Sequence, residues 1–269
     1  MKMALGSILV CVSLVLAGCM DDGDTVDDPV LGTTAQDITH NNGTQYNCPT
    51  GTCTFTLTSA LNQMCFLRGV YGDLWRFGSV KVARGVRGLS WVLTMQAPQN
   101  NNLRVTTECV TVSGPVTNAL FHTQAYQGGW GIYHGTSTSR CFLSEVTEGN
   151  GDAFNDFTTN FYIARTPGTN DLTMYPPSFP AGAEVTLGMQ CAEIPSLVGD
   201  WAYGNGTNTT VTQPPLITSG GSTKACGLTG IGGIFSTQST SDGIETQYSD
   251  PQWGWYISPW KGIYVECVQ

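Results

Sequence analysis

Three stretches of the chain open with the same cysteine motif and end at a second cysteine, and this repeat restricts the fold more than any other feature. The openings read CFLRGV, CFLSEV and CGLTGI, and the closings read RVTTEC, TLGMQC and GIYVEC. The three blocks span residues 65–109, 141–191 and 226–267. A repeat of this length is typical of supersecondary units that bury their apolar faces against one another.

The repeat also predicts how the cysteines pair. Of the ten cysteines, Cys11 lies in an apolar leader and Cys19 at its end, which leaves eight. The repeat selects one of the many possible pairings: Cys48–Cys53, Cys65–Cys109, Cys141–Cys191 and Cys226–Cys267. Zinc thiolates are the alternative. Zinc sites usually have two close cysteine pairs, or one such pair with a histidine pair, so no metal centre is expected.

The leader indicates where the protein resides. It has an early cation, Lys2, and then an apolar run shorter than the roughly 20 residues of a spanning helix. Its end, Leu16-Ala17-Gly18-Cys19, resembles the lipobox of bacterial lipoproteins. The resemblance implies that residues 1–18 are a signal peptide and that acyl chains attached to Cys19 enter a lipid bilayer. Because Met20 follows, and not the Asp that retains some lipoproteins at the inner membrane, the outer membrane is preferred.

Residues 19–43 contain six Asp and almost no large apolar side chains. Such a segment buries too little surface to offset its chain entropy, so an acidic, flexible tether is expected. The whole chain has a net charge of −9, which argues against nucleic acid as a partner.

From residue 44 to residue 269 the sequence predicts an all-β domain with no significant helix. Apolar and polar residues alternate in segments such as 54–59, 80–84, 103–112 and 263–268, and clusters of Gly and Asn separate them. The three disulfide-framed blocks are expected to form antiparallel sheets. We expect them to pack into one body with approximate threefold repetition, trefoil-like or propeller-like; three separate beads are the alternative.

Block one is rich in cations and offers a possible ligand surface. It carries six Arg or Lys residues and two acids, whereas block two carries one Arg and six acids. An anion site would combine guanidinium groups with flat indole rings, and the candidates are Trp75, Arg76, Arg84, Arg87 and Trp91. Acidic polysaccharide or lipopolysaccharide would suit it. The alternatives are that oppositely charged blocks attract each other, or that the charge differences are ordinary surface variation.

Block three holds the densest aromatic group, in the segment QWGWYISPW. Trp253 and Trp255 are two residues apart, so they share one face of a strand. If that face is exposed, the two indole rings stack on sugars. If it is buried, they form the core of the block.

Acidic residues of block two are the remaining candidates for chemistry. Glu145, Glu148, Asp152 and Asp156 could supply an acid and a base for glycoside hydrolysis. Glu148, Asp152 and Asp156 are also weak calcium candidates, and solvated acids are the plain alternative. There is no Gly-x-Ser-x-Gly motif, and neither His122 nor His134 lies in a catalytic context.

The Cys-x-Leu opening, the tryptophan strand and the closing cysteine resemble modules of uncharacterised exported bacterial lipoproteins, a likeness that implies no known activity. The sequence therefore favours a nonenzymatic, cofactor-free, lipid-anchored protein of the envelope or cell surface that binds a glycan or an envelope protein. The alternatives are a carbohydrate-active hydrolase that uses the acids of block two, and a structural envelope protein that acts through protein–protein contact.

Overall fold

The fold is known here from a computed structural model. It describes residues 38–40, 43–98, 102–112, 114–122, 131–149, 153–156, 159–178, 180, 182–194, 201–206, 211–217, 225–236, 239, 241–249 and 252–268. All of these residues fall in one compact unit of the chain, residues 32–269. Cys19 and the predicted signal peptide lie outside the described residues, as does the predicted tether apart from the short strand at residues 38–40 and residue 43.

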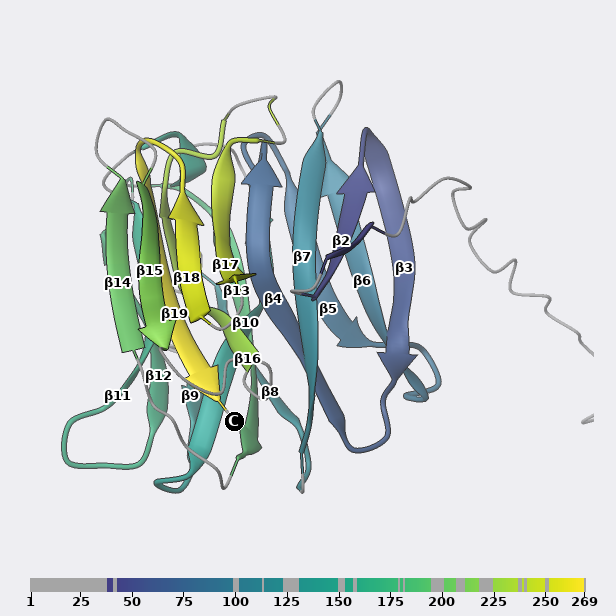
Figure 1. Cartoon of the computed structure of the whole chain (residues 1–269), viewed down its shortest axis with the longest axis vertical. Helices are drawn as coiled ribbons and strands as arrows, with labels where there is room; N and C mark the ends of the chain where they lie inside the picture. Colours follow the sequence, from purple (N-terminus) through teal and green to yellow (C-terminus); the bar gives the residue numbers. More distant parts are fainter. Residues whose placement is uncertain are drawn as a thin grey trace, which may run out of the picture. The chain divides into compact units, whose positions relative to one another are not determined.

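The protein is all-β, and its described strands form three antiparallel sheets (Figure 1). The first sheet has seven strands in the order β1-β2-β7-β4-β17-β18-β15. In that order they are Ile38–His40, Gly43–Cys48, Leu103–Thr111, Gln63–Gly72, Gly243–Ser249, Gln252–Ile257 and Val211–Ile217.

The other two sheets have six strands each. The second runs β3-β6-β5-β10-β13-β8, which are Gly51–Ser59, Ser90–Ala97, Ser79–Arg84, Ser139–Glu148, Val185–Glu193 and Thr117–His122. The third runs β14-β19-β16-β11-β12-β9, which are Trp201–Gly206, Lys261–Val268, Ala225–Gly233, Asn160–Arg165, Leu172–Ser178 and Ile132–Tyr133.

The same pairing scheme recurs in the three sheets. Each strand with an opening cysteine pairs on one side with the closing strand of its own block: β4 with β7, β10 with β13, and β16 with β19. On its other side it pairs with an inner strand of a different block: β4 with β17, β10 with β5, and β16 with β11. The blocks therefore share their sheets, which rules out three separate beads.

All four predicted disulfides are present: Cys48–Cys53, Cys65–Cys109, Cys141–Cys191 and Cys226–Cys267. In each of the three long bridges the two cysteines stand directly opposite each other in the antiparallel ladder. Their Cα atoms are only 4.0 to 4.1 Å apart. Each bridge thus joins the first and last strands of a block at one end of the pair.

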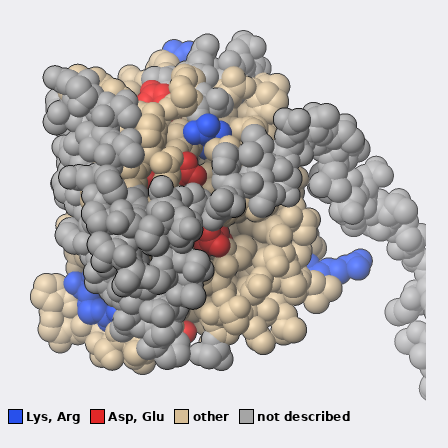
Figure 2. Space-filling view, viewed as in Figure 1, with Lys and Arg blue, Asp and Glu red and all other residues tan. Residues whose placement is uncertain are grey.

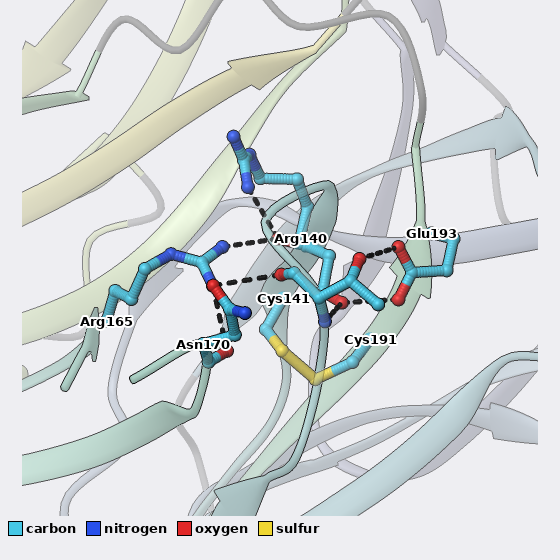
Figure 3. The surroundings of a disulfide bond; sticks show 8 residues. Arg140, Cys141, Arg165, Asn170, Cys191 and Glu193 are labelled. Atoms are coloured by element: carbon cyan, nitrogen blue, oxygen red, sulfur yellow. Dashed lines mark hydrogen bonds between the residues drawn. A yellow bond between two sulfur atoms is a disulfide. The ribbon is translucent and has the colours of Figure 1, made fainter. Parts of the chain in front are cut away.

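Hydrogen-bonded polar groups surround the disulfide of block two (Figure 3). The carboxylate of Glu193 accepts a hydrogen bond from Ser139 Oγ at 2.5 Å. On the other side of the bridge, Arg165 donates to the backbone carbonyls of Ser139 at 3.0 Å and Asn170 at 2.8 Å. Burial alone would raise the pKa of Glu193, but hydrogen bonds from Ser139, Thr136 and Thr138 outweigh it and lower that pKa. These groups satisfy one another, which is the pattern of a structural cluster.

A β-bulge follows the Cys-x-Leu motif in every block, because the ladder shifts register at the third residue after the cysteine. In block one this residue is Arg68, whose side chain is completely buried. It lies 3.0 Å from Glu108 and donates to the backbone carbonyl of Thr246 in β17 at 2.6 Å. A buried guanidinium needs such partners, so Arg68 ties block one to block three.

The core lies where the three opening strands β4, β10 and β16 contact one another. None of the three sheets closes on itself among the described strands, so the structure has open sheets. The single helical element of the described part is the 3-10 helix η2, Ala153–Asn155. The expectation of an all-β chain with disulfide-framed antiparallel sheets is confirmed.

Candidate functional site

Two of the residues predicted to bind a ligand, Trp75 and Arg76, lie together. The guanidinium carbon of Arg76 is 3.9 Å from the centre of the Trp75 ring. Trp75 is half-buried and Arg76 is exposed, in the turn that follows β4. The backbone of Arg76 and Phe77 is left-handed, with φ of 61° and 72°, an arrangement that costs free energy for residues other than glycine.

The prediction that Trp91 belongs to the same ligand surface is wrong. Trp91 is fully buried, and its indole nitrogen donates a hydrogen bond to the carbonyl of Gln63 at 2.9 Å. Arg84 is exposed at the end of β5, with its guanidinium carbon 5.5 Å from the Trp91 ring. Arg84 and Arg87 lie at the opposite end of β5 from Trp75, so the candidates do not form one groove.

The cations of block one are dispersed in the same way. Arg68 is buried, and the guanidinium carbon of Arg104 lies 3.7 Å from the centre of the Tyr71 ring. Lys81 forms an ion pair with Glu145 at 2.9 Å, which joins block one to block two. On the face shown in Figure 2, the charged side chains of the described residues are few and stand apart. The structure therefore has no single basic surface on block one among its described residues.

In block three, Trp255 is buried in the main hydrophobic core. Of the two alternatives for its side chain, an exposed platform for sugars or a part of the core, the second is therefore correct. Its side chain is 8% exposed, so it offers no platform for a sugar. The side chain of Trp253 lies outside the described residues.

The acids of block two do not share a cleft. Glu145 and Glu148 are three residues apart on β10, so their side chains leave opposite faces of the strand. Both residues are buried, at 8% and 2% exposure, and Glu145 forms its ion pair with Lys81. Asp152 lies outside the described residues. Among the residues that the structure covers, no three metal-ligating side chains come together, including around Asp156.

Glu148 instead holds two turns together. Its Oε1 atom accepts a hydrogen bond from the backbone N–H of Phe154 at 3.3 Å. Backbone N–H groups of Ala153 and Arg76 also bond to this carboxyl, and Arg76 belongs to the turn after β4. Burial raises the pKa of Glu148 to about 7, and the charge of Asp73 adds to the shift.

A pocket with a volume of about 350 Å³ lies at the turn between β18 and β19. Its lining residues come from the residue after β16, the two residues before β17, the end of β18, the turn between β18 and β19, and the start of β19: Ile234, Ser241, Asp242, Tyr256, Ser258, Pro259, Trp260 and Lys261. Its volume is within the range of small-ligand sites. The turn stands at the upper end of the strands in Figure 1.

Trp260 is the exposed aromatic residue of this pocket. Its side chain is 47% exposed, and its backbone is left-handed with a φ of 62°. The carbonyl of Trp260 accepts a hydrogen bond from Ile234 at 2.9 Å, and a Cβ atom at Gly233 would lie 1.9 Å from that carbonyl. Gly233 thus lets the β16 backbone approach this turn closely. Strained backbone of this kind in a bulky residue is concentrated at functional sites.

Hydroxyl groups line the pocket beside Trp260. Tyr256 donates to the carbonyl of Ser241 at 2.9 Å, and Ser258 Oγ lies 3.2 Å from the Tyr256 hydroxyl. Ser258 Oγ also accepts the backbone N–H of Gly243 at 2.9 Å. These bonds hold both hydroxyls in defined positions.

An ion pair closes the inner side of the pocket. Lys261 Nζ lies 2.7 Å from Asp242 Oδ1; the lysine side chain is 1% exposed and the aspartate side chain 22%. Burial lowers the pKa of Lys261, and its hydrogen bond to Asp242 opposes that shift. The Nζ atom also lies 5.0 Å from the centre of the Phe235 ring. The lysine therefore orients a carboxylate that remains partly accessible.

The outer face of the first sheet supports the pocket. The Tyr256 ring stacks on Tyr71, with 5.9 Å between the ring centroids. Tyr71 donates a hydrogen bond to Glu245 Oε2 at 2.5 Å. Burial raises the pKa of Tyr71, and the neighbouring charge of Glu245 raises it further, so the hydroxyl keeps its proton. The stacking on Tyr71 thus fixes the ring of Tyr256, and the hydrogen bond to Ser241 fixes its hydroxyl.

Sequence reasoning grouped Trp260 with its neighbours but did not select it. The available signal was its position: Pro259-Trp260 interrupts the apolar alternation between two strands, so the indole cannot join either core face.

Within the described residues, no helix has both the length and the apolar character needed to cross a membrane. Comparison of the sequence with known protein families and with curated proteins finds no match to either.

Proposed function

We propose that the protein is an exported, lipid-anchored envelope protein without enzymatic activity, and that it binds glycans through the pocket at residues 258–261. The observation that carries this proposal is Trp260, an exposed indole held in a strained backbone beside fixed hydroxyl and carboxylate groups.

The chemistry of the pocket matches that of a sugar. One face of a hexopyranose presents C–H groups, which pack on an indole ring, and its hydroxyls need donors and acceptors around the rim. Asp242 supplies a carboxylate acceptor, while Tyr256 and Ser258 supply hydroxyls. The ligand of this proposal is a monosaccharide unit or the end of a longer chain, because the pocket is small.

The location belongs to the same proposal. Four disulfides suit an oxidising compartment outside the cytoplasm. The lipobox at residues 16–19 supplies the signal peptide and the anchor, with the outer membrane as the preferred site. We also propose that the three blocks form a body with approximate threefold repetition; the recurring pairing of β4, β10 and β16 supports this.

A glycan array on the purified full-length protein tests the function. Trp260→Ala is expected to abolish binding to whichever glycans the native protein binds. Phe77→Ala is the matched control, because Phe77 is also an exposed aromatic residue in a left-handed turn but lies outside the pocket. Absence of binding to any glycan by the native protein would reject this ligand class and leave protein–protein contact as the function.

A further inference from the structure

Three strongly exposed apolar side chains lie on two adjoining turns at the other end of the strands. Leu61 is 77% exposed in the turn between β3 and β4; Val86 and Leu89 are 107% and 72% exposed in the turn between β5 and β6. The backbone N–H of Ala60 donates to the carbonyl of Leu89 at 2.9 Å, so the two turns are joined. We call Leu61, Val86 and Leu89 the apolar tip.

A groove with a volume of about 630 Å³ runs beside the apolar tip. Leu61 and Leu89 line one part of it, and Val112, Pro115 and Val116 line another. Ser59, Asn62, Gln63 and Arg84 also line the groove, so apolar and polar side chains share its surface. Exposed apolar side chains gathered beside such a groove mark an interaction site.

The charge around the tip has one sign. Arg84 lines the groove, and Arg87 stands exposed beside Val86 in the same turn. The three segments that build this end, residues 59–63, 84–90 and 112–116, contain these two arginines and no Asp or Glu. The chain as a whole has a net charge of −9, so the positive charge of this end is opposite in sign to that of the whole chain.

We propose that this end of the protein docks on a bilayer that contains anionic lipids. Leu61, Val86 and Leu89 enter the headgroup region, and Arg84 and Arg87 bind lipid phosphates. The strongly exposed side chain of Val86 suits a soft surface, which can surround it. Amphipathic elements with apolar tips and flanking cations partition into membrane interfaces through these two contributions.

This docking differs from the anchor at Cys19 and does not depend on the glycan pocket. It would hold the folded part against the membrane, with the β5–β6 turn facing the bilayer. The turn with Trp260 lies at the opposite end of the strands and would then face away from the bilayer.

Vesicle co-sedimentation of the full-length Cys19→Ala protein tests the proposal without acyl chains. Binding is expected to vesicles of phosphatidylglycerol and phosphatidylethanolamine, to fall with added salt, and to be much weaker to phosphatidylcholine alone. Loss of each arginine, as Arg84→Gln or Arg87→Gln, is expected to lower the partition coefficient about fivefold on anionic vesicles. Val86→Asp and Leu89→Asp are expected to lower binding on both vesicle types.

The controls change the same kinds of side chain at the opposite end. Arg76→Gln and Phe77→Asp are expected to leave vesicle binding unchanged. Val86→Ser repeats the test of the tip with an uncharged side chain, and near-ultraviolet circular dichroism checks that each variant is folded. Equal binding of the tip variants and the parent protein, or no binding to anionic vesicles, overturns the proposal. So does a photo-crosslinker at position 86 that captures a protein and no lipid in cells.

Discussion

The rings of Phe66 and Phe142 stack in the smaller of the two hydrophobic clusters, with 4.2 Å between their centroids and 17° between their planes. Each follows the opening cysteine of its block, and the residue in this place in the third block is Gly227. A Cβ atom at Gly227 would lie 2.5 Å from Phe66 and 2.6 Å from Phe142. Three equivalent strands therefore share a space that holds two rings, and the third block contributes only backbone.

Gly227→Ala is expected to destabilise the protein by about 1 to 3 kcal/mol, because an added methyl group overpacks the space beside the two rings. Phe66→Leu in the same chain is expected to recover part of that loss, since it removes the ring that the methyl group meets. A double-mutant cycle in urea measures the coupling between the two sites. Strict additivity of the two changes would show that positions 66 and 227 do not compete for one space.

The strands and the disulfides could be predicted because patterns within each block indicate both: apolar alternation indicates the strands, and the repeated cysteine spacing indicates the bridges. The cysteines of each block face each other across one antiparallel pair, as Cys226 and Cys267 do, so a repeated spacing is enough to identify partners. The pairing between blocks could not be predicted. Alternation shows that β5 is a strand, but not that β10 of the next block supplies its second neighbour.

The candidate site was harder to predict because burial depends on which face of a strand turns inward. Trp91, Leu93 and Met95 occupy every second position of β6, so they share one face of the strand, and all three are buried. The sequence therefore did contain the signal that Trp91 belongs to the core. Trp260 has no such pattern around it. Its exposure follows from the way the β18–β19 turn packs against Gly233 of β16, which is a tertiary contact.

Removal of the Cys226–Cys267 bridge, as the double alanine variant, is expected to cost about 4 kcal/mol, against about 2 kcal/mol for the Cys48–Cys53 bridge. The first closes a chain separation of 41 residues and the second a separation of 5, and the entropy lost by the unfolded chain grows with loop length. Urea unfolding of the two variants measures the difference. An equal cost for both bridges would contradict the loop-length argument.

Glu148 is expected to make stability depend on pH. Its pKa is raised to about 7 in the folded protein, from an ordinary value of 4.5, so the folded state favours the protonated acid. The contribution is fully present below the unfolded pKa and is lost as the pH rises through about 7. The thermal midpoint of the native protein should therefore fall as the pH rises from about 4.5 to about 7, between the unfolded and the folded pKa, and level off above that.

Glu148→Gln removes this dependence, since the amide keeps an acceptor for the N–H of Phe154 and cannot ionise. Glu145→Gln is the matched control, because Glu145 is on the opposite face of the same strand and pairs with Lys81. The Glu145→Gln protein is expected to keep the fall in stability between pH 4.5 and about 7. A Glu148→Gln protein whose midpoint still falls over this window would assign the titration to another group.

Two substitutions of Trp260 separate binding from backbone strain. Both Trp260→Ala and Trp260→Gly remove the indole ring, so both are expected to lose glycan binding. They differ in stability, because alanine keeps the cost of a left-handed backbone at φ 62°, and glycine adopts this conformation freely. The glycine variant is expected to be more stable by about 1 kcal/mol. Thermal melts of the two proteins measure this difference; a less stable glycine variant would mean that the turn relaxes when the indole is removed, and that the ring itself holds the strained conformation.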